Sequence, residues 1–322
     1  MKKNKLFIFL MYLGILLGGW GCSSGLLGLA PAGDRKEYSQ ARTLYEHGNY
    51  DLAITELQDY IYKTKNVRRR EARAYRLLGL SYEKKGQFSK ALETYLEALE
   101  FHPDNVPLLL EAARLYQQTN LTSRSMQLYE RALQQEPNNP EALAGQAVNY
   151  TAMGFYSQAR HFYDRFFEVN PTAPAQYRAR YAHTFLEQRN YEQAFINITM
   201  ALAEEKNNPD FWFLSAQARY GLKQLPQALL DLQAALTLAP QRPDLLGQQA
   251  LWLFETGALE EAQQTTQRLL QVNPQSQLAL WIQSLIALQQ NKEQQALRLR
   301  KQIVQMDSAS FIGRIAQKSL GK

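Results

Sequence analysis

Apolar residues recur at three- and four-residue intervals along most of this chain, which is the spacing of one face of a helix. In residues 72–105 the pattern runs through two segments that are separated by Gly86. The two segments predict helices joined by a short turn, and Pro103 marks the end of the second because proline cannot continue a helix. The apolar positions are Tyr75, Leu78 and Tyr82 in the first segment and Phe88, Leu92, Tyr95 and Leu99 in the second.

The same pattern repeats at an interval close to 34 residues. Pro103, Pro137 and Pro171 follow this interval, and so do Pro240 and Pro274. A series of small residues follows the same interval, with one member in the second helix of every predicted hairpin. A small side chain at such a position lets two helix axes approach closely. The series runs through Ala53, Ala91, Ser125, Ala159, Ala194, Ala228, Ala262 and Ala296.

These periods predict an array of helical hairpins over most of the chain. Each hairpin buries its apolar face only against its neighbours, so the open end of such an array needs a cap. A last helix over residues 311–322 supplies that cap. The predicted hairpins are residues 34–71, 72–105, 106–139, 140–174, 175–208, 209–242, 243–276 and 277–310.

The hairpin of residues 72–105 resembles the tetratricopeptide repeat at nearly every signature position of that family. The resemblance implies an all-α, right-handed superhelical α-solenoid of about eight such hairpins, with a concave groove that binds protein partners. The first and last hairpins keep fewer of the signature positions. The matching residues are Tyr75, Leu78, Gly79, Tyr82, Gly86, Phe88, Ala91, Tyr95, Ala98 and Pro103.

The N-terminus has the layout of a secretory signal: a basic "MKKNK", an apolar "LFIFLMYLGILL" and small residues before Cys22. Cys22 is the only cysteine of the chain, which excludes an intramolecular disulfide. The stretch resembles a bacterial lipobox, with the expected small Gly21, whereas Gly19 and Trp20 depart from the usual pattern. The resemblance implies a signal peptide over residues 1–21, a lipid on Cys22 and a tether over residues 22–33.

A lipid on Cys22 implies an anchor in the outer membrane that faces the periplasm, since Ser23 lacks the acidic character that retains lipoproteins in the inner membrane. The alternative is an uncleaved helix that anchors the chain in the inner membrane, because residues 6–33 hold no charged side chain. The cluster of small residues around Cys22 lowers helix propensity where such a span would continue.

The net charge and the motifs of the sequence limit which ligands and cofactors we expect the protein to bind. The formal net charge of +6 includes Lys2, Lys3 and Lys5, and the remaining charge is too dispersed for a nucleic-acid surface. The histidines lie in different hairpins without metal-ligand spacing, and no phosphate-binding loop or nucleophile motif is present in the sequence. We therefore expect no nucleic acid, no metal and no cofactor apart from the lipid on Cys22.

In the family that the chain resembles, the first helix of each hairpin lines the groove. Exposed aromatic residues often mark interaction sites, so the aromatic positions here are candidate partner contacts. The alternative is that they pack under neighbouring helices, Trp281 against Phe311, Ile312 and Ile315 above all. Projection of the pattern assigns to the groove Arg35, Tyr38, Arg42, Arg73, Arg76, Arg114, His183, Phe213, Tyr220, Leu251, Phe254 and Trp281.

The sequence thus indicates a non-enzymatic, lipid-anchored scaffold that binds protein partners in its groove and assembles or localises a cell-envelope complex. Type IV pilus or secretion, outer-membrane assembly, polysaccharide export and peptidoglycan machinery are the systems that the resemblance suggests. Two alternatives remain. One is the uncleaved inner-membrane adaptor, and the other is an envelope hydrolase that uses acids such as Glu187 and Glu255.

Overall fold

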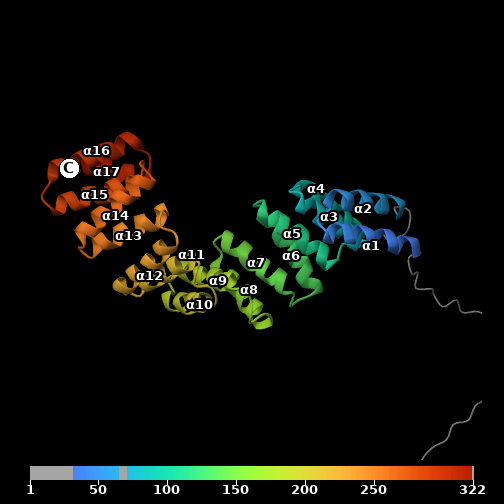
Figure 1. The fold of residues 1–322 in the computed structure, drawn as a ribbon. Helices are drawn as coiled ribbons and strands as arrows, with labels where there is room; N and C mark the ends of the chain where they lie inside the picture. The colour runs from blue at the N-terminus through green and yellow to red at the C-terminus, as the bar shows by residue number, and fades with distance from the viewer. Residues whose placement is uncertain (1–31, 65–70, 321–322) are drawn as a thin grey trace, which may run out of the picture. The chain divides into compact units, whose positions relative to one another are not determined.

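The computed structural model describes residues 32–64 and 71–320, with side chains from Lys36 onward. Every regular element in this part of the chain is an α-helix, which confirms the predicted all-α fold. The helices follow one another in consecutive hairpins (Figure 1). They fall into two compact units, one that ends at Gly86 and one that begins at Gln87. Cys22, the signal peptide and residues 22–31 of the predicted tether lie outside the described residues, whereas Ala32 and Gly33, predicted as tether, begin the first helix.

The N-terminal unit holds α1 (Ala32–Glu46), α2 (Tyr50–Thr64) and α3 (Ala72–Lys84). Leu57 and Tyr60 of α2 are fully buried, and the Tyr60 ring lies 6.3 Å from that of Tyr38 in α1. Gln58 donates a hydrogen bond of 2.9 Å to the hydroxyl of Tyr82 in α3. The middle helix is therefore held on both sides.

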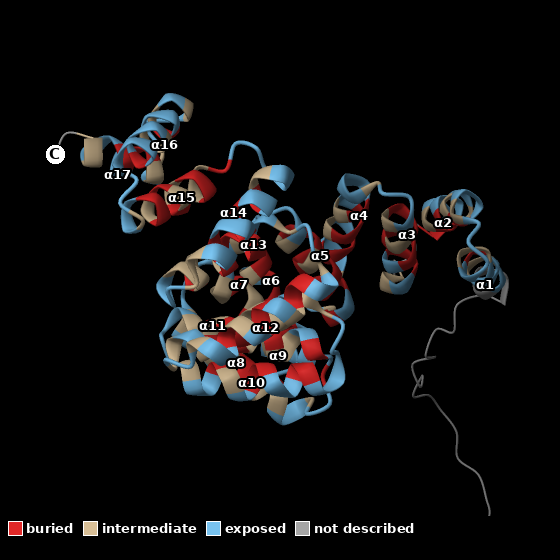
Figure 2. Ribbon diagram, turned by 60° about the vertical axis from the view of Figure 1, so that its left-hand side comes forward, coloured by how far each residue is buried: buried red, intermediate tan, exposed pale blue. Residues whose placement is uncertain are grey.

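The second unit begins with α4 and ends with α17, and between them the helices pair as hairpins. Figure 2 shows the buried residues as stripes along the facing sides of these helices. None of the described helices combines the length and the apolar character that crossing a bilayer requires. The helices are α4 (Phe88–Phe101), α5 (Val106–Gln118), α6 (Thr122–Gln135), α7 (Pro140–Ala152), α8 (Tyr156–Val169), α9 (Ala175–Glu187), α10 (Tyr191–Glu204), α11 (Pro209–Gly221), α12 (Leu225–Leu238), α13 (Pro243–Glu255), α14 (Leu259–Val272), α15 (Gln277–Gln289), α16 (Glu293–Met306) and α17 (Phe311–Leu320).

The small residues of the repeating series are buried between helices. All eight, from Ala53 to Ala296, are at most 1% exposed. Two glycines allow a tyrosine ring to lie close to the backbone, because a Cβ on Gly145 would lie 2.3 Å from the Tyr129 ring and one on Gly221 would lie 2.2 Å from the Tyr191 ring. Larger side chains at these positions would overpack the contact.

The turns inside the hairpins share one backbone feature, a residue with positive φ. Glycine adopts this conformation at no steric cost, whereas the Cβ of other L-residues comes too close to the following carbonyl oxygen. Asparagine tolerates it better than most residues, but Arg189 and Lys223 are strained. The positions are Gly48, Gly86, Gly154 and Gly257, and also Asn120, Arg189, Lys223 and Asn291.

The loops between hairpins are fixed by hydrogen bonds. Asn105 and Asn139 cap the helices that follow them, since each side-chain oxygen accepts a bond of 3.0–3.1 Å from a backbone N–H in the first turn. Arg165 in α8 donates a bond of 2.6 Å to the carbonyl of Pro137 in the preceding loop. Arg131 makes the equivalent bond to Pro103 one repeat earlier.

The junction between α8 and α9 is built from aromatic rings. Its loop is one residue longer than the loops before α7 and α11. Phe166 and Tyr177 lie 4.9 Å apart, and Tyr181 lies 5.4 Å from Tyr163 and 4.8 Å from Phe185, measured between ring centroids. Rings at these distances attract one another beyond the area they bury. They form the hydrophobic contact between α8 and α9 together with Phe167.

A charge pair between a buried aspartate and a half-buried arginine joins α11 and α12. Asp231 is 5% exposed, accepts a hydrogen bond of 2.6 Å from Ser215 and lies 3.2 Å from Nε of Arg219. The Arg219 guanidinium also lies 5.0 Å from the centre of the Phe195 ring. Burial raises the pKa of Asp231, and the Ser215 and Arg219 contacts oppose that rise. The pair thus fixes the register of the hairpin at a desolvation cost.

The strained turn at Lys223 gives a direct test of the hairpin geometry. Because glycine relieves the positive φ of 65°, Lys223→Gly should raise the free energy of unfolding by about 0.5–1 kcal/mol despite its greater freedom in the unfolded chain. Urea unfolding followed by circular dichroism measures the change. The matched control is Gly257→Ala at the equivalent turn, which should lower stability by about 1 kcal/mol. A less stable Lys223→Gly protein would contradict this account of the turn.

Candidate functional site

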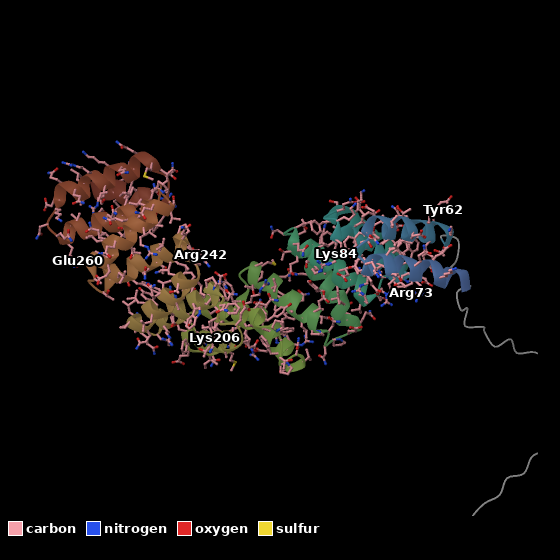
Figure 3. All side chains as sticks on the ribbon, viewed as in Figure 1. Tyr62, Arg73, Lys84, Lys206, Arg242 and Glu260 are labelled. Carbon is pink, nitrogen blue, oxygen red and sulfur yellow. The ribbon has the colours of Figure 1, made fainter. Side chains whose placement is uncertain are left out.

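Two groove residues predicted in the N-terminal unit contact each other, and two of the predicted arginines pair with carboxylates. The Arg73 guanidinium lies 4.7 Å from the centre of the Tyr38 ring, and Arg73 Nε also lies 2.6 Å from a carboxylate oxygen of Glu71 (Arg73 is labelled in Figure 3). This contact lowers the pKa of Glu71. Arg42 pairs with Glu46 at 2.8 Å. Part of the predicted basic charge is therefore balanced by carboxylates.

The remaining arginines of the predicted groove are placed separately. Arg76 is exposed on α3, and the side chain of Arg35 lies outside the described residues. Arg114 belongs to the second unit, where its guanidinium lies 3.0 Å from the carboxylate of Glu111, one turn earlier on α5. The structure brings Tyr38 and Arg73 together.

A surface pocket of about 470 Å³ lies within the second unit, where residues of α9, α11 and α13 converge with the turn after α9. It holds His183 and Tyr220, two of the predicted groove residues. Its lining mixes aromatic rings, two side-chain amides and charged groups of both signs. The lining residues are His183, Leu186, Glu187, Arg189, Tyr191, Gln217, Tyr220, Gln248 and Trp252.

Tyr220 and Trp252 form the aromatic wall of this pocket. Their rings are stacked, with centroids 4.7 Å apart and planes 11° from parallel. Trp252 is 2% exposed, whereas Tyr220 is 38% exposed and presents its outer face. The Tyr220 hydroxyl donates a bond of 3.0 Å to Glu255, and desolvation together with that bond raises the pKa of Tyr220.

A second tyrosine–carboxylate contact lies at Glu187. The hydroxyl of Tyr156, in α8, donates a bond of 3.3 Å to this carboxylate, and His183 Nε2 lies 3.5 Å from its other oxygen. Desolvation and the neighbouring carboxylate raise the pKa of Tyr156. Glu187 and Glu255, the acids proposed for a hydrolase, each accept a hydrogen bond from a tyrosine.

Tyr191 completes the pocket through a close helix contact. Gly221 lies at the end of α11, and its missing Cβ makes room for the Tyr191 ring of α10. Gln217 and Gln248 are half-buried and present amide groups, which can both donate and accept hydrogen bonds. A flat aromatic surface beside amides suits an extended peptide, because its backbone needs both donors and acceptors.

The other predicted aromatic residues pack against the core. Phe213 is half-buried against the cluster that contains Leu232 and Leu246. Leu251 and Phe254 pack against the cluster of Ala250, Ala262, Ile282 and Ile286. Trp281 packs against Leu280, Ile303 and Ala316 and lies 5.2 Å beneath the Arg300 guanidinium. A role for these four residues in partner binding stays a prediction.

The projection missed Trp252 and Gln248. The projection assigned His183, Tyr220 and Leu251 to one surface, but on α13 the pocket is lined by residues on the adjacent strip of the helix. The signal in the sequence was the large ring of Trp252, one position after Leu251, because two aromatic rings stabilise each other when they stack. In the described part of the chain no cluster of three or more His, Cys, Asp or Glu residues could hold a metal ion.

Comparison with known proteins identifies the repeat. Residues 38–106 and 182–243 match the tetratricopeptide repeat family. Human RANBP2-like and GRIP domain-containing protein 8 is 34% identical over 102 residues, which cover 31% of this chain and 6% of that protein. Human E3 SUMO-protein ligase RanBP2 is 36% identical over 87 residues, 27% of this chain and 3% of that protein. The chain thus spans a small fraction of these relatives.

Solved structures share the fold at greater sequence distance. A tetratricopeptide repeat protein from Parabacteroides merdae superposes with a TM-score of 0.55 at 17% identity, over 90% of this chain and 99% of the other. A structure described as a functional characterization of Pseudomonas aeruginosa pilF gives 0.55 at 18% identity, over 66% and 97%. At these identities the likeness concerns the fold alone.

The stack in the pocket predicts a spectroscopic change. Tyr220→Ala should uncover Trp252, so tryptophan emission should shift to longer wavelength and acrylamide quenching should increase. Loss of the stack should lower the free energy of unfolding by about 1 kcal/mol.

Tyr220→Phe keeps the ring and removes the bond to Glu255, so it should leave the emission unchanged. Tyr62→Ala is the control for loss of an exposed tyrosine, since Tyr62 is 77% exposed on α2. Unchanged emission in Tyr220→Ala would mean that Trp252 does not depend on Tyr220 for its cover.

Proposed function

From the tetratricopeptide repeat fold of the described chain, we propose that this protein is an interaction scaffold that holds a segment of a partner protein in the pocket between α9, α11 and α13. The observation that carries the proposal is the exposed face of Tyr220, which is stacked on the buried Trp252 and flanked by the amides of Gln217 and Gln248. Tyrosine and tryptophan anchors of this kind dominate the binding energy of protein interfaces.

The geometry of the pocket supports recognition of an extended segment. Its rings are held rigidly, because Trp252 lies in the core and Tyr191 rests on Gly221. A rigid site loses little side-chain entropy when a partner binds. The carboxylates of Glu187 and Glu255 add acceptors at its edges for N–H or cationic groups of the partner.

The N-terminal sequence extends the proposal to the cell envelope. Residues 1–21 act as a lipoprotein signal, Cys22 carries the lipid, and the protein is held at the outer membrane, where it helps to assemble or localise an envelope complex. The support is the order of basic, apolar and small residues before the sole cysteine. An anchor confines the scaffold to a thin layer and so raises its effective concentration toward other membrane-bound proteins.

Site-specific photocrosslinking tests the pocket. A benzophenone amino acid at position 220 should give a discrete adduct with a partner protein in cells of the source organism, since this side chain faces the pocket. The same probe at position 62 is the control, because Tyr62 is more exposed but lies on α2. Gln217→Ala combined with the probe at position 220 should weaken the adduct. Equal adducts from both positions, or none from position 220, would reject the pocket as the binding site.

Lipidation of Cys22 has its own test. Cells fed an alkyne fatty acid should incorporate the label into the protein, and Cys22→Ser should abolish incorporation and leave residues 1–21 attached. Mass spectrometry of the N-terminus measures both changes, and sucrose-gradient separation of the two membranes gives the location. An intact Met1 on the unaltered protein would instead favour the uncleaved inner-membrane anchor.

A further inference from the structure

The last helix, α17, packs on the end of the helix array through one face only. Gly313 and Ala316 are buried, and Ile312 packs on the cluster of Leu280 and Ile303. The approach at Gly313 is very close, because a Cβ there would lie 1.9 Å from the carbonyl oxygen of Asp307. This contact fixes which face of α17 points outward.

The outward face of α17 is both apolar and basic. Phe311 is 71% exposed and Ile315, one turn later, is 37% exposed. Arg314 and Lys318 are exposed as well, and the four residues follow the i, i+3, i+4, i+7 spacing of a single helix face. One of the two interpretations of the sequence packs Phe311 and Ile315 against Trp281, whereas the structure leaves both side chains exposed.

The surrounding charge is strongly positive. From Ala296 to the C-terminus the chain has six basic residues and one acidic residue, Asp307. The Asp307 carboxylate is used by the backbone, since it accepts bonds of 2.8 and 3.1 Å from the N–H groups of Ala309 and Ser310. Arg314 donates one bond of 2.6 Å to the Ala309 carbonyl and remains exposed.

We propose that this face of α17, formed by Phe311, Arg314, Ile315 and Lys318, docks on an anionic lipid surface. An aromatic and an aliphatic side chain on one helix face can enter the boundary between head groups and acyl chains, while cations beside them contact lipid phosphates. The charge of the chain's end complements such a surface.

The same charges disfavour a second copy of the chain as the occupant. In a two-fold contact the face would meet itself, so Arg314 and Lys318 of one copy would oppose the same cations of the other. The most exposed leucine of the second unit lacks this setting. Leu230 is 69% exposed, but its helix α12 contains no lysine or arginine.

A local probe tests the proposal in the full chain. In a Cys22→Ser background, Phe311→Cys carries an environment-sensitive NBD label, and the protein is reconstituted into vesicles of phosphatidylcholine alone or with phosphatidylglycerol. The label should shift to shorter wavelength and gain intensity in phosphatidylglycerol vesicles only. Raising the salt to 0.5 M should reverse the shift, because exposed charges are then screened.

Two variants make the result specific. Leu230→Cys with the same label should show no lipid-dependent shift, and Arg314→Gln with Lys318→Gln should abolish the shift at position 311. Circular dichroism confirms that each protein is folded. Equal shifts in both kinds of vesicle, a shift that the glutamine variants keep, or a shift that appears without lipid as the protein associates would overturn the proposal. Because the background lacks Cys22, failure here is independent of lipidation and of the pocket.

Discussion

The burial of one small residue between helices in every hairpin is the constraint on which the rest of the molecule depends. Ala228 and Ala262, for example, are fully buried at equivalent positions. Such a buried position leaves no room for a large side chain, so the larger apolar residues pack above and below it. Since each hairpin buries its apolar face on its neighbours, the direction of every outward side chain follows from these contacts.

The helices and their pairing could be predicted because both produce a period in the sequence. The apolar spacing marks the faces, and the small residues and prolines mark the register. Details that depend on how turns and side chains pack in three dimensions produce no period in the sequence. Lys223 and Arg189 occupy turns with positive φ although nothing in their side chains favours it, because the hairpin imposes the turn. The aromatic junction between α8 and α9 likewise fills a space that a longer loop creates.

Part of the candidate site could also be predicted from the repeat. The repeat placed His183 and Tyr220 on a common surface, and the structure brings them into one pocket. The repeat pattern could not predict that Trp252 lines the pocket. Which strip of residues on α13 faces the pocket depends on the position of the Tyr220 ring. Phe213 and Phe254 lie in the predicted register but pack against the core, since a neighbouring helix offers each ring an apolar surface.

The end of a helix array follows a different rule from its interior. Inside the array the next hairpin covers each apolar face, whereas a terminal helix of such an array is usually polar on its outer side. Here α17 meets its neighbours with Ile312 and the small residues Gly313 and Ala316, and it turns Phe311 outward. Stability alone would favour the reverse arrangement, because burying Phe311 removes far more apolar surface from water than burying an alanine. Arg314 and Lys318, the cations on the outer face of α17, complement the charge of an anionic lipid surface. Contact with lipid would bury the Phe311 side chain, which the fold leaves exposed.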